Sequence, residues 1–176
     1  YLQELTVRFY PDHQSLLPAY DRGEIDGVSW IWPQEIADAA KREDLELFSA
    51  PLSGYTLVYL NQQNPNTPFF KEQAVRQALL YALDRQKLVD TLLSGQGLVA
   101  QSPILPGTWA NDPSVKQYTY DPERARQLLD EAGWKDSDGD GVRDRDGVKV
   151  DYVLLVNDQE ARELSGQVRS VPAFHD

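Results

Sequence analysis

The chain of 176 residues contains no cysteine, no methionine and only two histidines. Without cysteine it forms no disulfide, no thiolate metal site and no thiol nucleophile. The histidines, His13 and His175, lie near opposite ends of the chain without an obvious catalytic partner, and the sequence has no zincin helix, nucleophile elbow or phosphate-binding glycine loop. We therefore predict no enzyme and no catalytic cofactor. A hydrolase with paired carboxylates is the enzymatic alternative that so acidic a chain leaves open.

Positive charge and long apolar runs are also scarce. Seventeen basic residues against twenty-eight acidic ones give a net charge of −11, which repels phosphate backbones, so nucleic acid is not an expected partner. No apolar run reaches the roughly 18 residues of a membrane helix, so we expect no direct membrane insertion. Because the chain begins at Tyr1 and has no methionine, we expect a processed product or an excised segment, and the compartment has to be inferred from elsewhere.

Length and composition limit the number of domains that the chain can form. A chain of this size with 41% hydrophobic residues buries one core and is too short for two generous domains. We predict a single domain over residues 1–176. Residues 158–176 show no clear periodicity and are expected to form a frayed end or a truncated continuation.

Apolar residues recur with two different periods. Alternation or continuous apolar runs predict strands at Leu5–Phe9, Ile25–Trp30, Leu45–Phe48, Tyr55–Leu60 and Val148–Val156. Helical spacing and capping residues predict helices that begin near Asp12 or Ser15, at Pro33, at Glu72, after Asp84 and after Asp121. Strands that alternate with helices favour an α/β or α+β fold in which helices flank a mixed sheet.

The helix after Asp121 has the clearest signals in the chain. Asp121 and Pro122 are suited to the cap and the first helical position, and Gly133 to the left-handed position just past the end. Trp134 follows directly and is expected to pack back onto the helix. Asp84 is interpreted as the end of the helix that begins at Glu72 and as the cap of the helix that follows it.

Three separated blocks resemble a known family. They are DRGEID at Asp21–Asp26, the stretch Tyr59–Arg85, and YDPERARQLLDEAGWKDSDGDGVRDRDG at Tyr120–Gly147. Their order and spacing resemble family 5 of the extracellular solute-binding proteins, the oligopeptide, dipeptide and nickel receptors of ABC importers. The resemblance implies a partial lobe of a periplasmic-binding-protein type II fold, the lobe that does not carry the protein's N-terminus.

The same resemblance implies a function. It predicts a periplasmic or extracellular receptor that captures a peptide or related solute in a cleft between two lobes and delivers it to the permease of an ABC transporter. The expected partners are the solute, the permease and the remaining lobe of the parent protein. The sequence leaves open which solute binds and whether the parent is lipid-anchored.

Five residues are candidates for ligand contacts. Tyr59 and Asn61 lie where a predicted strand enters a loop, and Ser102 lies in a proline-bounded loop. Such positions often line clefts. Trp32 and Trp109 are candidate apolar platforms, with burial in the core as the alternative for both. Arg76 and Arg85, by contrast, are interpreted as surface or helix-end charges and not as partners of a ligand carboxylate.

The segment DSDGDGVRDRDG (residues 136–147, the aspartate loop) resembles an EF-type calcium loop. Its candidate ligands, at alternate positions, are Asp136, Asp138, Asp140, the carbonyl of Val142 and Asp144. The last ligand position, normally Glu, is Gly147, so the site is weak or is completed by another carboxylate such as Asp146. The alternatives are a structural Ca²⁺ site or a solvated Asp-Gly turn. A calcium-dependent structural or adhesion module is accordingly the alternative function.

Overall fold

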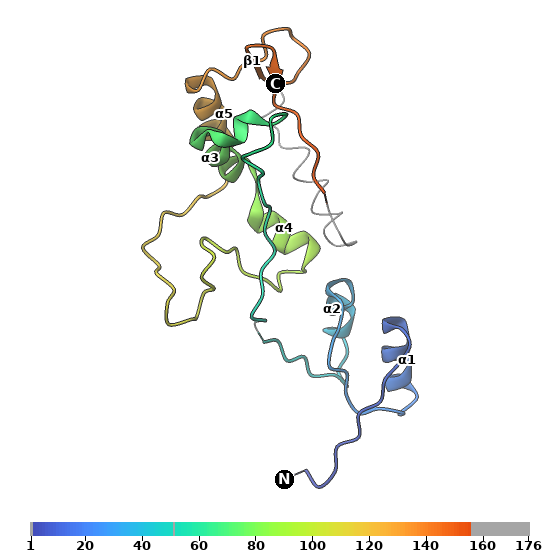
Figure 1. Ribbon diagram of the computed structural model, residues 1–176. Coiled ribbons are helices and arrows are strands. Elements are labelled where there is room, and N and C mark those ends of the chain that lie inside the picture. Colours follow the sequence, from blue (N-terminus) through green and yellow to red (C-terminus); the bar gives the residue numbers. More distant parts are fainter. Residues whose placement is uncertain (1, 51, 156–176) are drawn as a thin grey trace. The chain divides into compact units, whose positions relative to one another are not determined.

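The computed structural model describes residues 2–50 and 52–155 (Figure 1). The chain forms two compact units, residues 1–47 and residues 48–176. The single domain over residues 1–176 stays a prediction, and the expected frayed end at 158–176 lies outside the described residues. Within the described residues, no helix has the length and hydrophobicity to cross a bilayer.

The first unit contains only short helices. They are the 3-10 turn η1 (His13–Ser15), α1 (Leu16–Asp21) and α2 (Pro33–Ala39). Asp12 caps the first turn, because its carboxylate accepts hydrogen bonds from the Ser15 backbone N–H at 2.9 Å and from the Ser15 hydroxyl at 2.6 Å. Helix α2 begins at Pro33 as predicted and ends at Ala39.

An arginine ties the first unit together. Arg42 forms ion pairs with Asp21 and Asp44, each at 2.7 Å, and its guanidinium lies 5.4 Å from the centre of the Tyr20 ring. The Tyr20 hydroxyl donates to the carbonyl of Asp44 at 2.8 Å. These contacts join the end of α1 to the segment after α2.

The second unit contains the larger helices and a small hairpin. Its elements are η2 (Pro68–Lys71), α3 (Gln73–Ala82), α4 (Arg85–Leu92), α5 (Pro122–Glu131), β1 (Asp144–Arg145) and β2 (Val148–Lys149). Helices α3 and α5 pack against each other (Figure 1). The buried core consists of Phe69, Phe70, Val75, Ala78, Ala82, Ala125, Leu129, Trp134 and Val150. The core is thus built from the apolar faces of two helices, the turn before α3 and the hairpin after α5.

The helix ends confirm the predicted caps. The carboxylate of Asp84 accepts from the Lys87 N–H at 3.0 Å, and that of Asp121 accepts from the Arg124 N–H at 2.9 Å. These bonds satisfy N–H groups that have no partner inside the helix. Gly133, at φ 82°, adopts the left-handed conformation that ends α5.

Trp134 packs back onto α5, as predicted. Its indole is 2% exposed and meets the Phe69 ring edge to face, with centroids 5.9 Å apart. Its backbone N–H donates to the carbonyl of Leu129 at 2.9 Å. A buried tryptophan of this kind fixes how the chain leaves α5.

Four predicted strands are wrong. Residues 5–9, 25–30, 45–48 and 55–60 form no strand within the described part of the chain (Figure 1). Their apolar side chains are largely exposed, for example Leu5 at 78%, Phe9 at 94% and Tyr59 at 87%. Alternation marks a surface suited to a sheet, but a strand exists only where a neighbouring strand accepts and donates its backbone hydrogen bonds.

The predicted strand Val148–Val156 is mostly wrong as well. Only Val148–Lys149 forms a strand, in an antiparallel pair with β1 that sets Asp144 opposite Lys149. Val150 is buried, and its N–H donates to the carbonyl of Arg143 at 2.8 Å. Beyond it Val153 is 85% and Leu155 95% exposed, while Val156 lies outside the described residues. The local hairpin pairs two residues, and the rest of the apolar run has no strand beside it in the described residues.

Candidate ligand-binding surface and aspartate loop

Arg85 holds both ends of the loop that carries Ser102 and Trp109. Its guanidinium donates to the carbonyl of Ala100 at 2.8 Å, to the side-chain oxygen of Gln101 at 3.1 Å and to the carbonyl of Tyr118. Burial lowers the pKa of Arg85 from its ordinary value. The guanidinium therefore donates to backbone carbonyls at both ends of the loop and holds the two ends of residues 100–118 together.

Arg76 has a similar role at the start of α3. Its guanidinium donates to the carbonyl of Phe70 at 2.7 Å and to that of Lys71 at 2.8 Å. Both arginines are partly buried, and each lies in the first turn of its helix, in keeping with their interpretation as surface or helix-end charges. Desolvated guanidinium groups of this kind satisfy carbonyl groups that helices and turns leave open.

Within the Arg85-closed loop, residues 99–117 surround a small hollow of about 150 Å³. Its lining residues are Val99, Gln101, Ser102, Ile104, Pro106, Asn111, Asp112, Pro113, Val115 and Gln117. The Ser102 hydroxyl donates to the carbonyl of Ile104 and accepts from its N–H, both at 3.1 Å. Ser102 therefore shapes the loop as well as lining the hollow.

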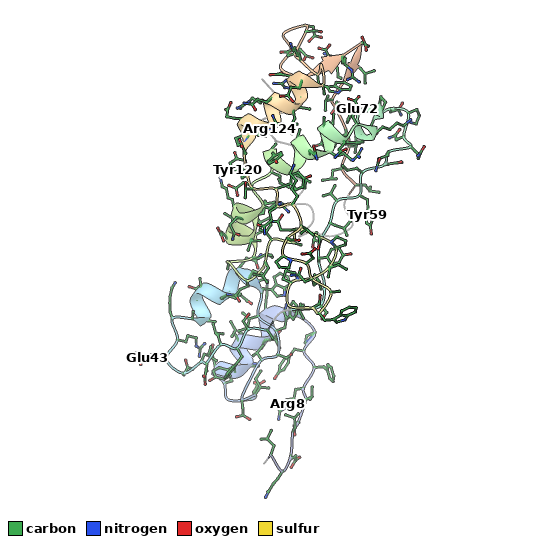
Figure 2. The ribbon with its side chains drawn as sticks, turned by 90° about the vertical axis from the view of Figure 1, so that its left-hand side faces the viewer. Arg8, Glu43, Tyr59, Glu72, Tyr120 and Arg124 are labelled. Carbon is green, nitrogen blue, oxygen red and sulfur yellow. The ribbon has the colours of Figure 1, made fainter. Side chains whose placement is uncertain are left out.

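The other candidate contacts do not line this hollow. Trp109 is 99% exposed, and Tyr59, labelled in Figure 2, is 87% exposed. Asn61 is exposed, and its side-chain oxygen accepts from the N–H of Gln63 at 3.0 Å. Trp32 lies in the first unit, 53% exposed, and its N–H donates to the Glu35 carboxylate at 3.3 Å. Burial in the core, the alternative for Trp32 and Trp109, is thus wrong for both.

An aromatic pair at the end of the loop was not predicted. The rings of Tyr81 and Tyr118 meet edge to face at 5.2 Å, and the Lys116 ammonium lies 4.9 Å from the centre of the Tyr118 ring. The amide of Gln77 donates to the Tyr118 hydroxyl at 3.0 Å. These contacts attach the loop to α3, and no local pattern marks them because the partners are distant in sequence.

A second unpredicted cluster joins the hairpin to the beginning of α3. Arg145 donates through two nitrogens to the carboxylate of Glu72, labelled in Figure 2, and its guanidinium lies 4.2 Å from the centre of the Trp134 ring. It also donates to the carbonyl of Ala132 at 2.6 Å, and the Trp134 indole N–H donates to Glu72 at 3.3 Å. The Glu72 carboxylate raises the pKa of Arg145. One arginine thus links three segments of the second unit.

In the aspartate loop, Asp136 and Asp144 organise the backbone. Asp136 accepts from the N–H groups of Gly139 at 2.8 Å and Gly141 at 3.0 Å. Asp144 accepts from the N–H and the hydroxyl of Ser137, at 2.9 and 2.6 Å. The bonds from Ser137, from its hydroxyl above all, lower the pKa of Asp144. This arrangement fixes the turn and keeps Asp144 ionised at neutral pH.

Three of the predicted calcium ligands lie close together. Asp136, Asp138 and Asp144 each have a carboxylate oxygen within 4.8 Å of the others, whereas Asp140 is not part of this group in the described residues. Asp140 accepts instead from the N–H of Val142 at 2.9 Å and contacts the Lys149 ammonium. The calcium site stays a prediction.

The suggested completing ligand, Asp146, does not join the three carboxylates that lie together in the described residues. Its side chain is 94% exposed and lies 4.0 Å from the Nε of Arg145. Asp146 has a positive φ of 53°, which places it in the tight connection between β1 and β2. The turn explains its position without a metal role.

Comparison with known sequences decides the family. The family described as bacterial extracellular solute-binding proteins, family 5 middle, matches residues 1–168. The chain belongs to this family. The family 5 chain is 34% identical over 159 residues to the oligopeptide-binding protein AppA of Bacillus subtilis, an alignment that covers 89% of this chain and 28% of AppA. It is 27% identical over 171 residues to the nickel-binding periplasmic protein of Escherichia coli, covering 93% of this chain and 32% of that protein.

Solved structures agree with the family assignment. NikA from Brucella suis in complex with Fe(III)-EDTA matches 97% of the family 5 chain and 35% of its own, with a TM-score of 0.79 and 26% identity. AppA from Bacillus subtilis in complex with a nonapeptide matches 95% and 34%, with a TM-score of 0.69 and 29% identity. The α/β fold of the periplasmic binding proteins is thereby confirmed. The chain spans about a third or less of the length of these relatives.

Proposed function

We propose that the chain is part of a receptor that captures a peptide in a cleft between two lobes and delivers it to the permease of an ABC importer. The observation that carries this proposal is the match to AppA, an oligopeptide-binding protein, which extends over 89% of this chain. The likeness to the nonapeptide complex of AppA supports it further. A receptor of this kind works outside the cytoplasmic membrane, in the periplasm or extracellularly, and performs no catalysis.

Tyr59, Asn61, Ser102 and Trp109 of the second unit are proposed as ligand contacts, and Trp32 of the first unit is proposed as a further contact by itself. Trp109 is the strongest of these, because a 99% exposed indole on a loop braced by Arg85 presents a rigid, flat apolar surface. Aromatic side chains in such positions bind with little loss of conformational entropy. Ser102, at the hollow of the same loop, supplies a hydroxyl for a polar group of the solute.

The remaining lobe of the parent protein is proposed as an intramolecular partner. Residues 52–60 carry large exposed apolar side chains, and no backbone hydrogen bond joins them to another described residue. Open backbone groups beside apolar side chains are suited to pairing with further strands. Strands from the rest of the longer protein would complete a sheet along this segment.

A peptide is favoured over a metal chelate by the relatives. Identity to the oligopeptide-binding relative is 34%, against 27% for the nickel-binding one. The test is thermal unfolding of the full-length protein with short peptides, oligosaccharides and nickel-histidine. A ligand at about 100 times its dissociation constant adds about 2.7 kcal/mol to the free energy of unfolding. Stabilisation by peptides alone supports the proposal, and stabilisation by nickel-histidine or a sugar instead contradicts the assigned solute.

Trp109 can be tested directly. Trp109→Ala is expected to weaken peptide binding about tenfold, or about 1.4 kcal/mol, because it removes an aromatic platform. The control is Leu98→Ala, another exposed apolar residue of the same unit, 70% exposed, which is expected to leave affinity unchanged. Equal affinity of both variants and the wild type, measured by calorimetry, would remove Trp109 from the site.

The calcium-dependent module makes a different prediction. It requires that chelation unfold the whole chain, whereas the receptor requires at most local loosening of the aspartate loop. Circular dichroism of the protein with and without a chelator separates the two. Global loss of helical signal on chelation would replace the receptor with the calcium-dependent module.

A further inference from the structure

The carboxylates of the aspartate loop are already provided with hydrogen-bond donors. Asp136 and Asp144 receive theirs from the loop backbone and from Ser137 on both of their oxygens. Asp138 and Asp140 each use one oxygen for a backbone N–H, of Asp140 at 3.3 Å and of Val142 at 2.9 Å. The second carboxylate oxygen of Asp138 and that of Asp140 both contact a cation.

That cation is a side chain of the protein. The Lys149 ammonium donates to Asp138 at 2.9 Å and also to Asp140. Lys149 lies on β2 directly opposite Asp144 on β1, so the strand pairing itself aims the side chain at the loop. Backbone bonds between Lys135 and Asp144, at 3.1 and 2.8 Å, hold the two ends of the loop together.

We propose that the ammonium group of Lys149 takes the place of a metal ion in the aspartate loop, which is thereby closed without calcium. Asp136, Asp138, Asp140 and Asp144 repel one another, and a positive charge among them relieves that repulsion. Lys149 supplies this charge from within the chain and pairs with Asp138 and Asp140, two of the predicted calcium ligands. Calcium therefore has to displace a tethered ammonium group before it can bind.

Substitution of Lys149 tests the proposal in the intact protein. The wild type should unfold at the same temperature in a chelator and in about 1 mM CaCl₂, the range in which extracellular calcium sites work. Lys149→Met should unfold at a lower temperature in the chelator and recover when calcium is added. Calorimetric titration with CaCl₂ should show binding to Lys149→Met that is at least about tenfold tighter than to the wild type, because a competing positive charge is gone.

Two controls make the outcome decisive. Lys149→Arg keeps the charge and should remain insensitive to calcium, and Lys87→Met removes one positive charge from α4, away from the loop, and should behave like the wild type. Stabilisation of the wild type by calcium to the extent seen in Lys149→Met would overturn the proposal. If Lys149→Met does not fold, stabilisation of the wild type by calcium is by itself enough to overturn the proposal.

Discussion

The helical core of the second unit and the apolar segment 52–60 of the same unit differ in what each needs to form secondary structure. In the core, α3 and α5 pack through buried side chains, and Val75, Ala78 and Leu129 are completely inaccessible. In segment 52–60 of the same unit, Tyr59 is 87% exposed. Both regions are apolar, so hydrophobicity does not distinguish them.

The difference lies in where the backbone finds its hydrogen bonds. A helix satisfies its own backbone within four residues and needs only a cap and an apolar face to pack. A strand depends entirely on a neighbour. The helices are therefore complete within the described chain, while segment 52–60 is proposed to be completed by the rest of the longer protein. Substitutions in the packed core should therefore lower the free energy of unfolding more than substitutions at exposed positions.

The largest effect is expected at Trp134. Trp134→Ala removes an indole that is 2% exposed and leaves a cavity among Phe69 and α5, so it should lower the free energy of unfolding by about 3–5 kcal/mol. Trp109→Ala, at a position that is 99% exposed, should change it by less than about 0.5 kcal/mol. Urea unfolding followed by circular dichroism compares the two. Similar losses in the free energy of unfolding for the two variants would show that side-chain exposure does not distinguish a core position from a loop position.

A smaller effect is expected at Glu72, which connects the hairpin to the core. Glu72→Gln removes the charged partner that Arg145 contacts through two nitrogens, leaves Arg145 only the 4.0 Å ion pair with Asp146 among the described residues, and should cost about 1–3 kcal/mol. The matched control is Glu131→Gln, whose carboxylate is 66% exposed and 3.4 Å from Arg124, and it should cost less than about 0.5 kcal/mol. Equal losses in urea unfolding would mean that the Glu72 pair is no more than a surface contact.

The cap of α5 comes next. Asp121→Ala removes the acceptor of the Arg124 N–H and should lower the free energy of unfolding by about 1 kcal/mol. Asp121→Asn should retain most of the stability, because an asparagine side chain also accepts from that N–H. Thermal unfolding of the three proteins is the measurement. A loss in Asp121→Asn as large as in Asp121→Ala would assign the effect to charge and not to the capping bond.

The smallest effect is the acid response of the aspartate loop. Hydrogen bonds from Ser137 hold the pKa of Asp144 below its ordinary value of 3.8, so its stabilising contribution is present above that value. The contribution is lost as the pH falls through the lower folded-state pKa. The amide resonance of Ser137 should therefore shift only below about pH 3.8. Asp144→Asn should abolish that step, and a midpoint above the ordinary value would contradict the assigned sign.

Local signals in the sequence predicted the helices and their ends. Asp84, Asp121, Pro122 and Gly133 act as expected because each works within a few residues of its own position. The resemblance to family 5 likewise rested on contiguous blocks and was confirmed. The turn η2 was missed, because a 3-10 turn of four residues has no apolar periodicity of its own.

Contacts between distant residues could not be predicted in this way. Arg145 and Glu72 are separated by 73 residues, and Arg85 and Tyr118 by 33. Nothing in the local pattern links such partners. The same limit applies to the strands, because alternation shows which side chains suit a sheet but does not identify the neighbouring strand. For the ligand contacts, the sequence identified loops, and the structure adds which side chains are exposed on them.

Hydrogen exchange tests the central comparison most directly. The measurement compares backbone amides of residues 52–60 with those of α3, in the chain of residues 1–176 and in the full-length protein. Helix α3 should be protected in both, whereas segment 52–60 should exchange rapidly in the shorter chain and become protected in the longer one. Rapid exchange of residues 52–60 in the full-length protein would show that no strand completes this segment and would contradict the proposed pairing.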